Sequence, residues 1–271
     1  MDNNYRLQSF STLIDAANNA GLDSVEVDLD GVERFVNDPQ TADSGVPSTQ
    51  HSCAVVDMGP YEFPVGQAEI VDWKSVVTHG ASNTIGLVVG SDSTFSESRD
   101  DGIVKLRVSF SSPIDPATVS AGNVVICGND VNSQTVNLSG ITITTSVLSG
   151  DMGVDINFSP KLPNYARYRV RLDGVTDVAC HTITTNNERI LTALFGDITG
   201  DRRVNATDVG GARSLVPRYT IDPGITPEVR SDVDTDNDID ENFDPPSDTD
   251  VEFVRDQVPK DARYIANPSC P

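Results

Sequence analysis

The stretch Val104-Lys105-Leu106-Arg107-Val108-Ser109-Phe110 alternates apolar and polar side chains. Successive side chains of an extended strand point to opposite faces of a sheet, so this pattern predicts a half-buried strand. The same alternation recurs in residues 154–158 and 168–172, and shorter apolar pieces at 124–126 and 141–143 predict two more strands. Strands at this spacing, separated by Gly, Pro, Asn and Asp, indicate an antiparallel β-sandwich.

The block 64–194 around these strands resembles the bacterial Ig-like domains of surface-layer and adhesin-type proteins. The resemblance rests on the strands and on two strings, Pro113-Ile114-Asp115-Pro116-Ala117-Thr118-Val119 and Gly174-Val175-Thr176-Asp177. It implies an Ig-like sandwich that acts as a spacer. Cys127 and Cys180 both fall in this block, and the sequence leaves open whether they form a disulfide or remain two buried thiols.

The block 1–63 is irregular, and it resembles the last coils of pectate-lyase-like parallel β-helices. The resemblance lies in five strings: Tyr5-Arg6-Leu7-Gln8, Leu13-Ile14-Asp15-Ala16, Asp28-Leu29-Asp30-Gly31, Arg34-Phe35-Val36-Asn37-Asp38, and the closing Val56-Asp57-Met58-Gly59-Pro60-Tyr61-Glu62-Phe63. A solenoid coil takes roughly 20 residues or more, so this block holds at most two or three. Residues 1–20 also lack the features of a signal peptide. We therefore expect the chain to be the C-terminal part of a longer secreted or cell-surface protein.

The block 195–262 contains a first acidic loop with the spacing of a calcium site. Calcium takes oxygen ligands, and an EF-hand-type loop supplies them from positions 1, 3, 5, 7, 9 and 12. From position 1 onward the candidate ligands are Asp197, Thr199, Asp201, Arg203 through its backbone carbonyl, Asn205 and Asp208. Val204 is the apolar residue that would anchor the loop. Val209, Ala212, Leu215 and Val216 then have the spacing of a helix, which Pro217 ends.

A second loop begins 35 positions later, since Asp232 corresponds to Asp197. Its candidate ligands at positions 1, 3, 5, 7 and 9 are Asp232, Asp234, Asp236, Asp238 and Asp240, and Ile239 is the anchor. Phe243 at position 12 cannot be a ligand, and residues 243–249 look like an insertion. We assign the twelfth ligand to Asp250, because it directly precedes a helical string at 251–255 as Asp208 precedes its own; Asp244 is the main rival.

The two loop–helix repeats resemble a dockerin of the type I, F-hand class, a module that binds two calcium ions and docks onto cohesin domains. The resemblance implies a cohesin-like protein partner that contacts Ala206-Thr207 and Glu241-Asn242. Thr199, Arg202 and the insertion in the second loop depart from the family pattern. Between Asp232 and Asp250 there are nine acids and no base, so compaction requires a cation. Residues 263–271 form a short tail.

Composition limits the remaining functions. The 41 acids and 19 bases give a net charge of −22, which excludes nucleic acid and anionic membranes as partners. None of the three histidines, His51, His79 and His181, has a metal-ligand partner two to four positions away in a helical context. His51 and Cys53 are close, but nearby Pro and Ser indicate a loop, so we interpret this spacing as coincidence. GxSxG, P-loop and GxGxxG motifs are absent. The sequence therefore predicts a non-catalytic, calcium-binding structural and interaction region. The alternative is the accessory C-terminal part of a polysaccharide-degrading enzyme whose catalytic β-helix lies upstream.

Overall fold

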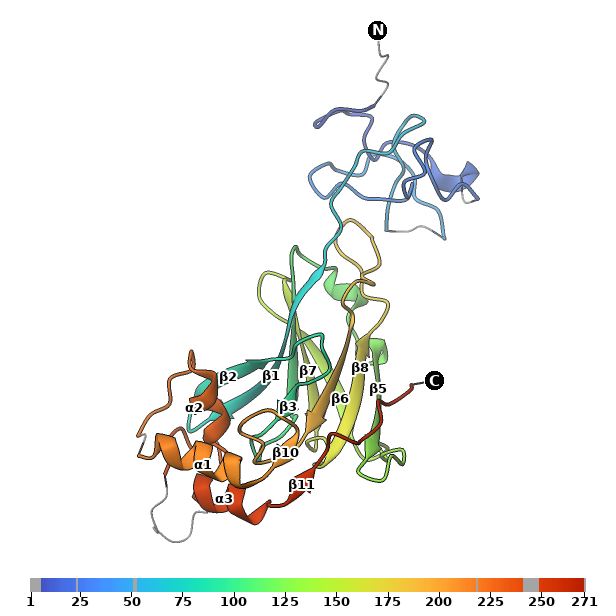
Figure 1. Cartoon of the computed structure of the whole chain (residues 1–271). Coiled ribbons are helices and arrows are strands. Elements are labelled where there is room, and N and C mark those ends of the chain that lie inside the picture. Colours follow the sequence, from blue (N-terminus) through green and yellow to red (C-terminus); the bar gives the residue numbers. More distant parts are fainter. Residues whose placement is uncertain (1–5, 23, 51–52, 218, 241–248, 271) are drawn as a thin grey trace.

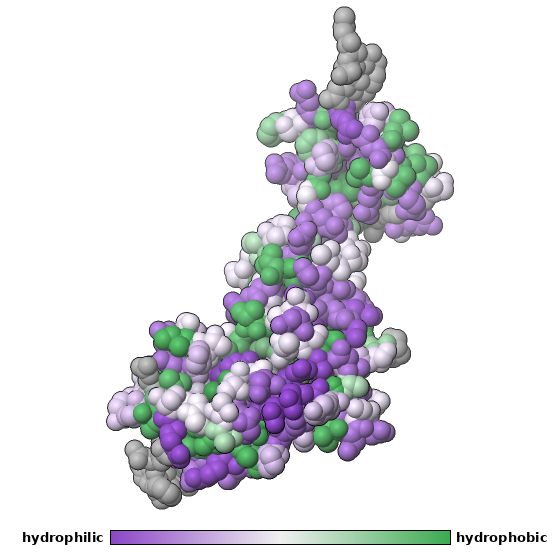
Figure 2. All heavy atoms as spheres, in the orientation of Figure 1, coloured by the Kyte–Doolittle hydropathy of each residue, from purple (hydrophilic) through white to green (hydrophobic). Residues whose placement is uncertain are grey.

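The computed structural model describes residues 6–22, 24–50, 53–217, 219–240 and 249–270. It contains three sheets and a few short helices, which confirms a mostly β chain with a small helical part near its C-terminal end. Figure 1 shows an irregular N-terminal block at one end, the two large sheets in the middle and the helices at the other end. A narrower region joins the N-terminal block to the rest (Figure 2). Within the described ranges, no helix is both long and apolar enough to cross a membrane.

The middle block consists of two sheets. The larger has the strand order β2-β1-β4-β7-β6 and the smaller the order β3-β9-β8-β5, and all neighbours are antiparallel except β3 and β9. The strands are β1 (Ile70–His79), β2 (Asn83–Val88), β3 (Ser96–Glu97), β4 (Lys105–Phe110), β5 (Val124–Asp130), β6 (Thr142–Val147), β7 (Gly153–Ser159), β8 (Ala166–Leu172) and β9 (Glu188–Ala193). Short 3-10 turns span Asn19–Gly21, Pro116–Thr118 and Ala121–Asn123.

One hydrophobic core lies between the two sheets and follows the predicted alternation. Leu106, Val108 and Phe110 of β4 are buried, while the polar residues between them are half-buried. The larger sheet contributes Trp73 and the smaller contributes Tyr168, both fully buried. Each large side chain removed from water stabilises the fold by about 1.5–3 kcal/mol. All five predicted strands exist, and the structure adds β1, β2, β3 and β9, which the sequence analysis missed.

Three helices and a small sheet form the C-terminal part. They are α1 (Ala206–Leu215), α2 (Thr226–Ser231), α3 (Asp250–Asp256), and β10 (Arg203–Val204) paired with β11 (Lys260–Asp261). The predicted helices after each acidic loop are thus confirmed as α1 and α3, and α2 was not predicted. Val204, Val251 and Val254 belong to a core of their own beneath these helices. Ile221, Val229 and Ile239 instead extend the core of the sandwich, so the two parts pack tightly together.

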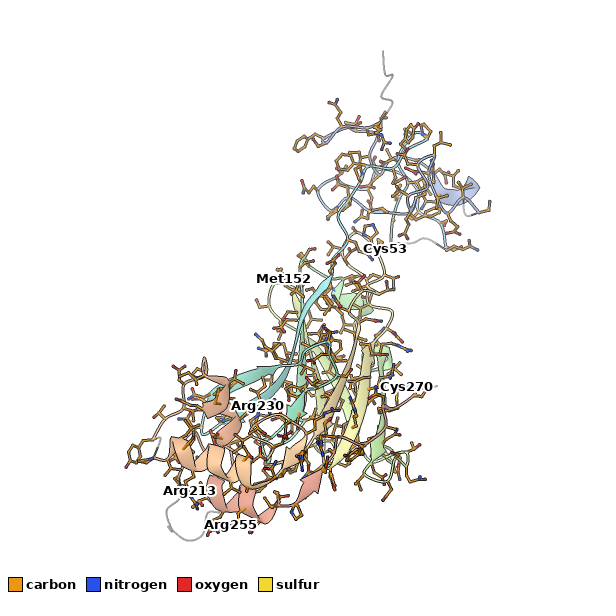
Figure 3. The ribbon with its side chains drawn as sticks, in the orientation of Figure 1. Cys53, Met152, Arg213, Arg230, Arg255 and Cys270 are labelled. Carbon is orange, nitrogen blue, oxygen red and sulfur yellow. A yellow bond between two sulfur atoms is a disulfide. The ribbon has the colours of Figure 1, made fainter. Side chains whose placement is uncertain are left out.

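The disulfides correct the sequence analysis, because Cys127 and Cys180 are neither bridged to each other nor free. Cys127 pairs with Cys270, with Cα atoms 5.4 Å apart, and Cys180 pairs with Cys53, with Cα atoms 6.0 Å apart. Cys127 lies within edge strand β5, along which the C-terminal tail runs. Figure 3 shows Cys270 there and Cys53 at the junction with the N-terminal block. The Cys127–Cys270 disulfide thus attaches the C-terminal tail to β5.

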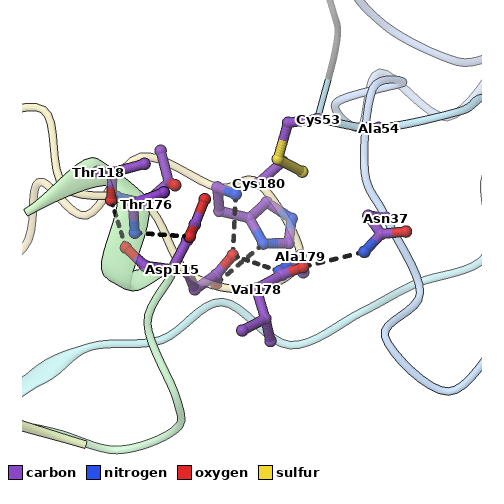
Figure 4. The surroundings of a disulfide bond; sticks show 12 residues. Asn37, Cys53, Ala54, Asp115, Thr118, Thr176, Val178, Ala179 and Cys180 are labelled. Atoms are coloured by element: carbon purple, nitrogen blue, oxygen red, sulfur yellow. Dashed lines mark hydrogen bonds and ion pairs between the residues drawn. A yellow bond between two sulfur atoms is a disulfide. The ribbon is translucent and has the colours of Figure 1, made fainter. Parts of the chain in front are cut away.

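The turn that holds Cys180 attaches the N-terminal block to the sandwich. Asp177 shapes it by accepting hydrogen bonds from the backbone N–H groups of Ala179 and His181, both at 2.9 Å. Asn37 then donates its backbone N–H to Ala179 and its side-chain amide to Val178, both at 3.0 Å (Figure 4). Cys180 and His181 are therefore part of a joint between two blocks.

Within the N-terminal block the described residues form turns and isolated bridges but no regular strands. Its small core contains Phe35, Ala54 and Val56. The buried Asn19 connects neighbouring segments, because its side chain donates to the Ala54 carbonyl and accepts from the Val56 N–H.

Candidate metal centre

The second acidic loop brings carboxylates from two separated segments together. Asp232, Asp234 and Asp250 each offer an oxygen within 4.8 Å of the others, and so do Asp238, Asp240 and Asp250. Asp250 belongs to both groups. Among the described residues, these are the groups of three or more carboxylate, histidine or cysteine ligands that lie close enough to hold one ion. Asp236 is not in either group.

Asp250 occupies the position in loop 2 that Asp208 occupies in loop 1. One Asp208 oxygen accepts from the position-3 backbone N–H of Thr199, and the other from the position-9 N–H of Asn205, both at 2.9 Å. One Asp250 oxygen accepts from the position-3 N–H of Asp234, and the other from the position-9 N–H of Asp240, both at 3.3 Å. The insertion therefore leaves the closing carboxylate in place. Asp244, the rival, lies outside the described residues.

The backbone of the two loops also repeats. At position 4, Gly200 has φ of 73° and Thr235 has φ of 63°. At position 6, Arg202 has φ of 65° and Asn237 has φ of 84°. Residues other than glycine rarely adopt this left-handed backbone conformation, and holding such a residue in it costs on the order of 1–3 kcal/mol. Arg202, which departs from the glycine of the dockerin pattern, thus adopts the turn that glycine normally makes.

Position 1 anchors each turn in the same way. Asp197 accepts the position-6 N–H of Arg202 at 2.8 Å, and Asp232 accepts that of Asn237 at 3.0 Å. Both aspartates are fully buried. The two loops therefore repeat each other in structure as well as in sequence.

Loop 2 concentrates negative charge in a buried place. Burial, followed by the charges of Asp234 and Asp232, raises the pKa of Asp250 to about 9. Burial and the neighbouring Asp236 raise the pKa of Asp234 to about 7 and that of Asp238 to about 6. Carboxylates whose ionisation is opposed in this way are stabilised when a cation enters between them.

Two carboxylate oxygens in loop 2 also lack a protein partner. Asp232 Oδ1 and Asp238 Oδ1 are both buried and accept no hydrogen bond. A buried acceptor without a partner is costly, on the order of 1–3 kcal/mol. Hard oxygen donors in this number are the ligands that calcium takes, so the residues of loop 2 fit the ion.

Loop 1 fits a cation less well, because protein groups already satisfy the carboxylate oxygens of Asp197 and Asp208. The second oxygen of Asp197 accepts from the backbone N–H groups of Gly200 and Asp201, and Asp208 also accepts from the Thr199 hydroxyl. The Arg230 guanidinium lies against Gly200 and donates to the Asp197 carbonyl at 3.1 Å. Burial raises the pKa of Asp197 to about 6, although the Arg230 charge opposes this. The positively charged Arg230 side chain thus already lies beside this loop.

The remaining predicted residues of loop 1 lie at its rim. Asp201 and Asn205 accept backbone N–H groups two residues further along the chain, from Arg203 and Thr207. Arg203 lies in β10, paired with Asp261. Val204 and Ile239, the predicted anchors, are both fully buried; Val204 packs among the helices and Ile239 in the sandwich core.

The sandwich itself supports loop 2. Gly80 donates its N–H to the Thr235 carbonyl at 2.6 Å, and Asp100 donates its N–H to the Val233 carbonyl at 2.7 Å. A side chain at position 80 would lie 3.0 Å from the Asp236 carbonyl oxygen, so this approach favours glycine. His79 also contacts Asp232, which the sequence analysis did not foresee.

A second group of buried acids lies in the N-terminal block, outside the predicted site. Asp57 accepts the Asp15 backbone N–H at 2.8 Å, and Glu62 accepts the Asp57 N–H at 3.1 Å. Burial, then the charge of Asp57, raises the pKa of Asp15 to about 7 and that of Glu62 to about 8. In the part of the chain that the structure covers, these acids do not form one of the close carboxylate groups described above.

The stability of the N-terminal block should therefore fall as the pH rises through neutrality. Both pKa values are higher in the folded chain than the unfolded values of about 4, so the contribution is complete below about pH 4 and is lost as the pH passes 7 and 8. Calorimetry between about pH 5 and pH 8.5 should show this loss. The neutral variant Asp15→Asn/Glu62→Gln should lose roughly half as much or less. Equal losses in both proteins would contradict the assignment.

Comparison with known proteins finds little similarity in sequence or structure. No protein-family model matches the chain, and no curated protein matches it. A structure of the N-terminal part of the bacterial S-layer protein SbsC is 19% identical, covers 36% of this chain and 22% of its own, and has a TM-score of 0.27. A structure of SbsC domains 1–6 is 14% identical, covers 48% of this chain and 14% of its own, and has a TM-score of 0.30. The chain thus spans less than a quarter of these bacterial S-layer structures, and TM-scores of this size do not indicate a common fold.

Proposed function

We propose that this chain is a non-catalytic structural region of a secreted or cell-surface protein, and that calcium in loop 2 locks its helical part onto its β-sandwich. The observation that carries the proposal is that Asp232, whose buried Oδ1 has no protein partner, forms a close carboxylate group with Asp234 and Asp250. Carboxylates this close, two of them fully buried, repel each other when they ionise, and a divalent cation converts the repulsion into attraction.

The sequence order of the ligands explains what calcium does for the fold. Asp232 follows α2, whereas Asp250 begins α3. An ion held by both carboxylates joins the two helices across the inserted segment. Since α2 contributes Val229 to the sandwich core and α3 contributes Val251 to the helical core, the ion connects both cores. Loop 1, with Arg230 beside it, takes the weaker second site.

The two disulfides support an extracellular location, because such bonds persist in oxidising compartments. The paired sheets support an Ig-like assignment for the middle block. The parallel bridge between Asn18 and Val46, together with the buried Asn19, supports a solenoid end for the first block. The matched loops support the dockerin-like assignment for the third.

Docking onto a cohesin-like partner is a second role that one observation favours. Ala206 and Thr207, at the start of α1, are exposed, while Ala212 on the same helix is buried against the core. The equivalent residues of the second repeat, Glu241 and Asn242, lie outside the described residues. A polysaccharide-degrading enzyme as the parent protein remains the alternative setting for the same structural role.

Calcium should raise the thermal midpoint of the full chain by roughly 5–10 °C. A ligand at 100 times its dissociation constant stabilises the folded form by about 2.7 kcal/mol, provided that it does not bind the unfolded chain. Titration calorimetry should show one tight site and one weaker site. Magnesium serves as the control, because it demands a smaller octahedral shell and should stabilise less. An unchanged midpoint with calcium and with chelator would refute the proposal.

A further inference from the structure

A continuous chain of buried polar groups leads from loop 2 into the sandwich. Asp232 Oδ2 lies 2.6 Å from His79 Nδ1, at the end of β1, and His79 Nε2 lies 3.1 Å from a terminal nitrogen of Arg99. Arg99 in turn forms a two-pronged ion pair with Glu97 of β3, at 2.7 and 2.8 Å. All four residues are fully buried. The chain therefore connects the first ligand position with both sheets.

The hydrogen-bond partners fix the state of His79. The five N–H donors of Arg99 are all used, because the guanidinium also donates to the backbone carbonyls of Ile85 and Ser75. An arginine remains protonated in proteins, so the nitrogen of His79 that faces it must accept. His79 therefore carries its proton on Nδ1 and donates it to Asp232.

This donation sets the direction of the Asp232 carboxylate. Oδ2 receives the His79 proton and the N–H of Asn237, so Oδ1 is left over and has no protein partner. The carboxylate cannot turn without breaking one of these two bonds. A partner that orients a ligand in this way typically changes metal affinity by about 10–100-fold when it is removed.

We propose that His79 is a positioning residue of the calcium site. We further propose that the chain His79–Arg99–Glu97 transmits calcium binding in loop 2 to the hydrogen bonds inside the sandwich. This inference rests on the calcium role proposed above. An ion bound at Oδ1 attracts the negative charge of the Asp232 carboxylate and so alters its hydrogen bond with His79. Because His79 also accepts from Arg99, this alteration reaches the Arg99–Glu97 pair. The metal site is then shared between the helical part and the sandwich, although all its ligands come from the helical part.

The test compares two replacements of His79 in the full chain by calcium titration calorimetry. His79→Leu removes the donor and should weaken the tight site at least tenfold. His79→Asn places an amide donor near the position of Nδ1 and should retain most of the affinity. His181→Leu is the matched control, because His181 also faces a carboxylate, Asp177 at 3.2 Å, but at the far end of the sandwich. It should leave calcium affinity unchanged.

A second measurement keeps the proposal testable if His79→Leu does not fold. Nitrogen-15 NMR of the unmodified protein should show His79 protonated on Nδ1 alone, and calcium should shift the His79 and Arg99 side-chain signals but not those of His181. A proton on Nε2, or calcium binding that leaves these signals unmoved, would overturn the inference. Equal affinities of the wild type and folded His79→Leu would do the same. If the wild type binds no calcium at all, the proposed function fails instead.

Discussion

Replacing Asp250 with asparagine should abolish the tight calcium site and remove most of the stabilisation by calcium. Asp250 is the carboxylate shared by both ligand groups, and it alone comes from the far side of the insertion. At saturating calcium the variant should unfold with a free energy about 3 kcal/mol lower than the wild type. In chelator the two proteins should differ less, by about 1–2 kcal/mol, because the neutral side chain relieves the repulsion from Asp234 and Asp232. The remaining difference arises because an amide nitrogen cannot accept one of the backbone hydrogen bonds that Asp250 accepts.

The matched control is Asp244→Asn, which removes one charge from the inserted segment at the rival position. It should leave both the affinity and the midpoint close to those of the wild type. Urea titrations with and without calcium, together with calorimetry, give both quantities for each variant. Loss of calcium binding in Asp244→Asn, with binding retained in Asp250→Asn, would move the twelfth ligand into the insertion and contradict the position described here.

Much of the candidate site could be predicted because its information is local. The ligand spacing from Asp232 to Asp240 lies within one short stretch, and the anchors Val204 and Ile239 recur at the same position of each loop. Asp250 is the candidate twelfth ligand because it directly precedes a helix, and in the structure it accepts hydrogen bonds from the backbone of loop 2. The candidate ligands and the helices after them therefore follow from neighbours in the sequence.

The support of the site could not be predicted, because it comes from distant parts of the chain. His79 and Asp232 are separated by 153 positions, and no local pattern pairs them. Strand β1 was missed for a related reason. Its buried face carries Ser75 and His79, so the polar network interrupts the apolar alternation by which strands are recognised. The disulfide partners could not be predicted from the sequence either, because the spacing of cysteines does not determine which of them pair.

Replacing Glu97 with alanine should lower the free energy of unfolding by about 3–5 kcal/mol, a large effect for a single substitution. Although burial opposes its ionisation, the Arg99 guanidinium holds the pKa of Glu97 below its usual value. Without Glu97, the fully buried Arg99 keeps its charge but loses its direct counter-ion. The Ser75 hydroxyl, which donates to Glu97, also loses its acceptor.

A chemically matched pair on the same sandwich provides the control. Arg169 and Glu188 form an ion pair at 2.6 Å, but their side chains are 28% and 31% exposed. Water already screens this pair, so Glu188→Ala should cost less than about 1 kcal/mol. Urea unfolding followed by fluorescence of Trp73, the single tryptophan, measures both variants with the same probe. If the two substitutions cost the same, the buried chain from Glu97 to Asp232 contributes no more than a surface ion pair. In that case the sandwich and the calcium loop are held together by their shared apolar core and by the backbone hydrogen bonds from Gly80 and Asp100.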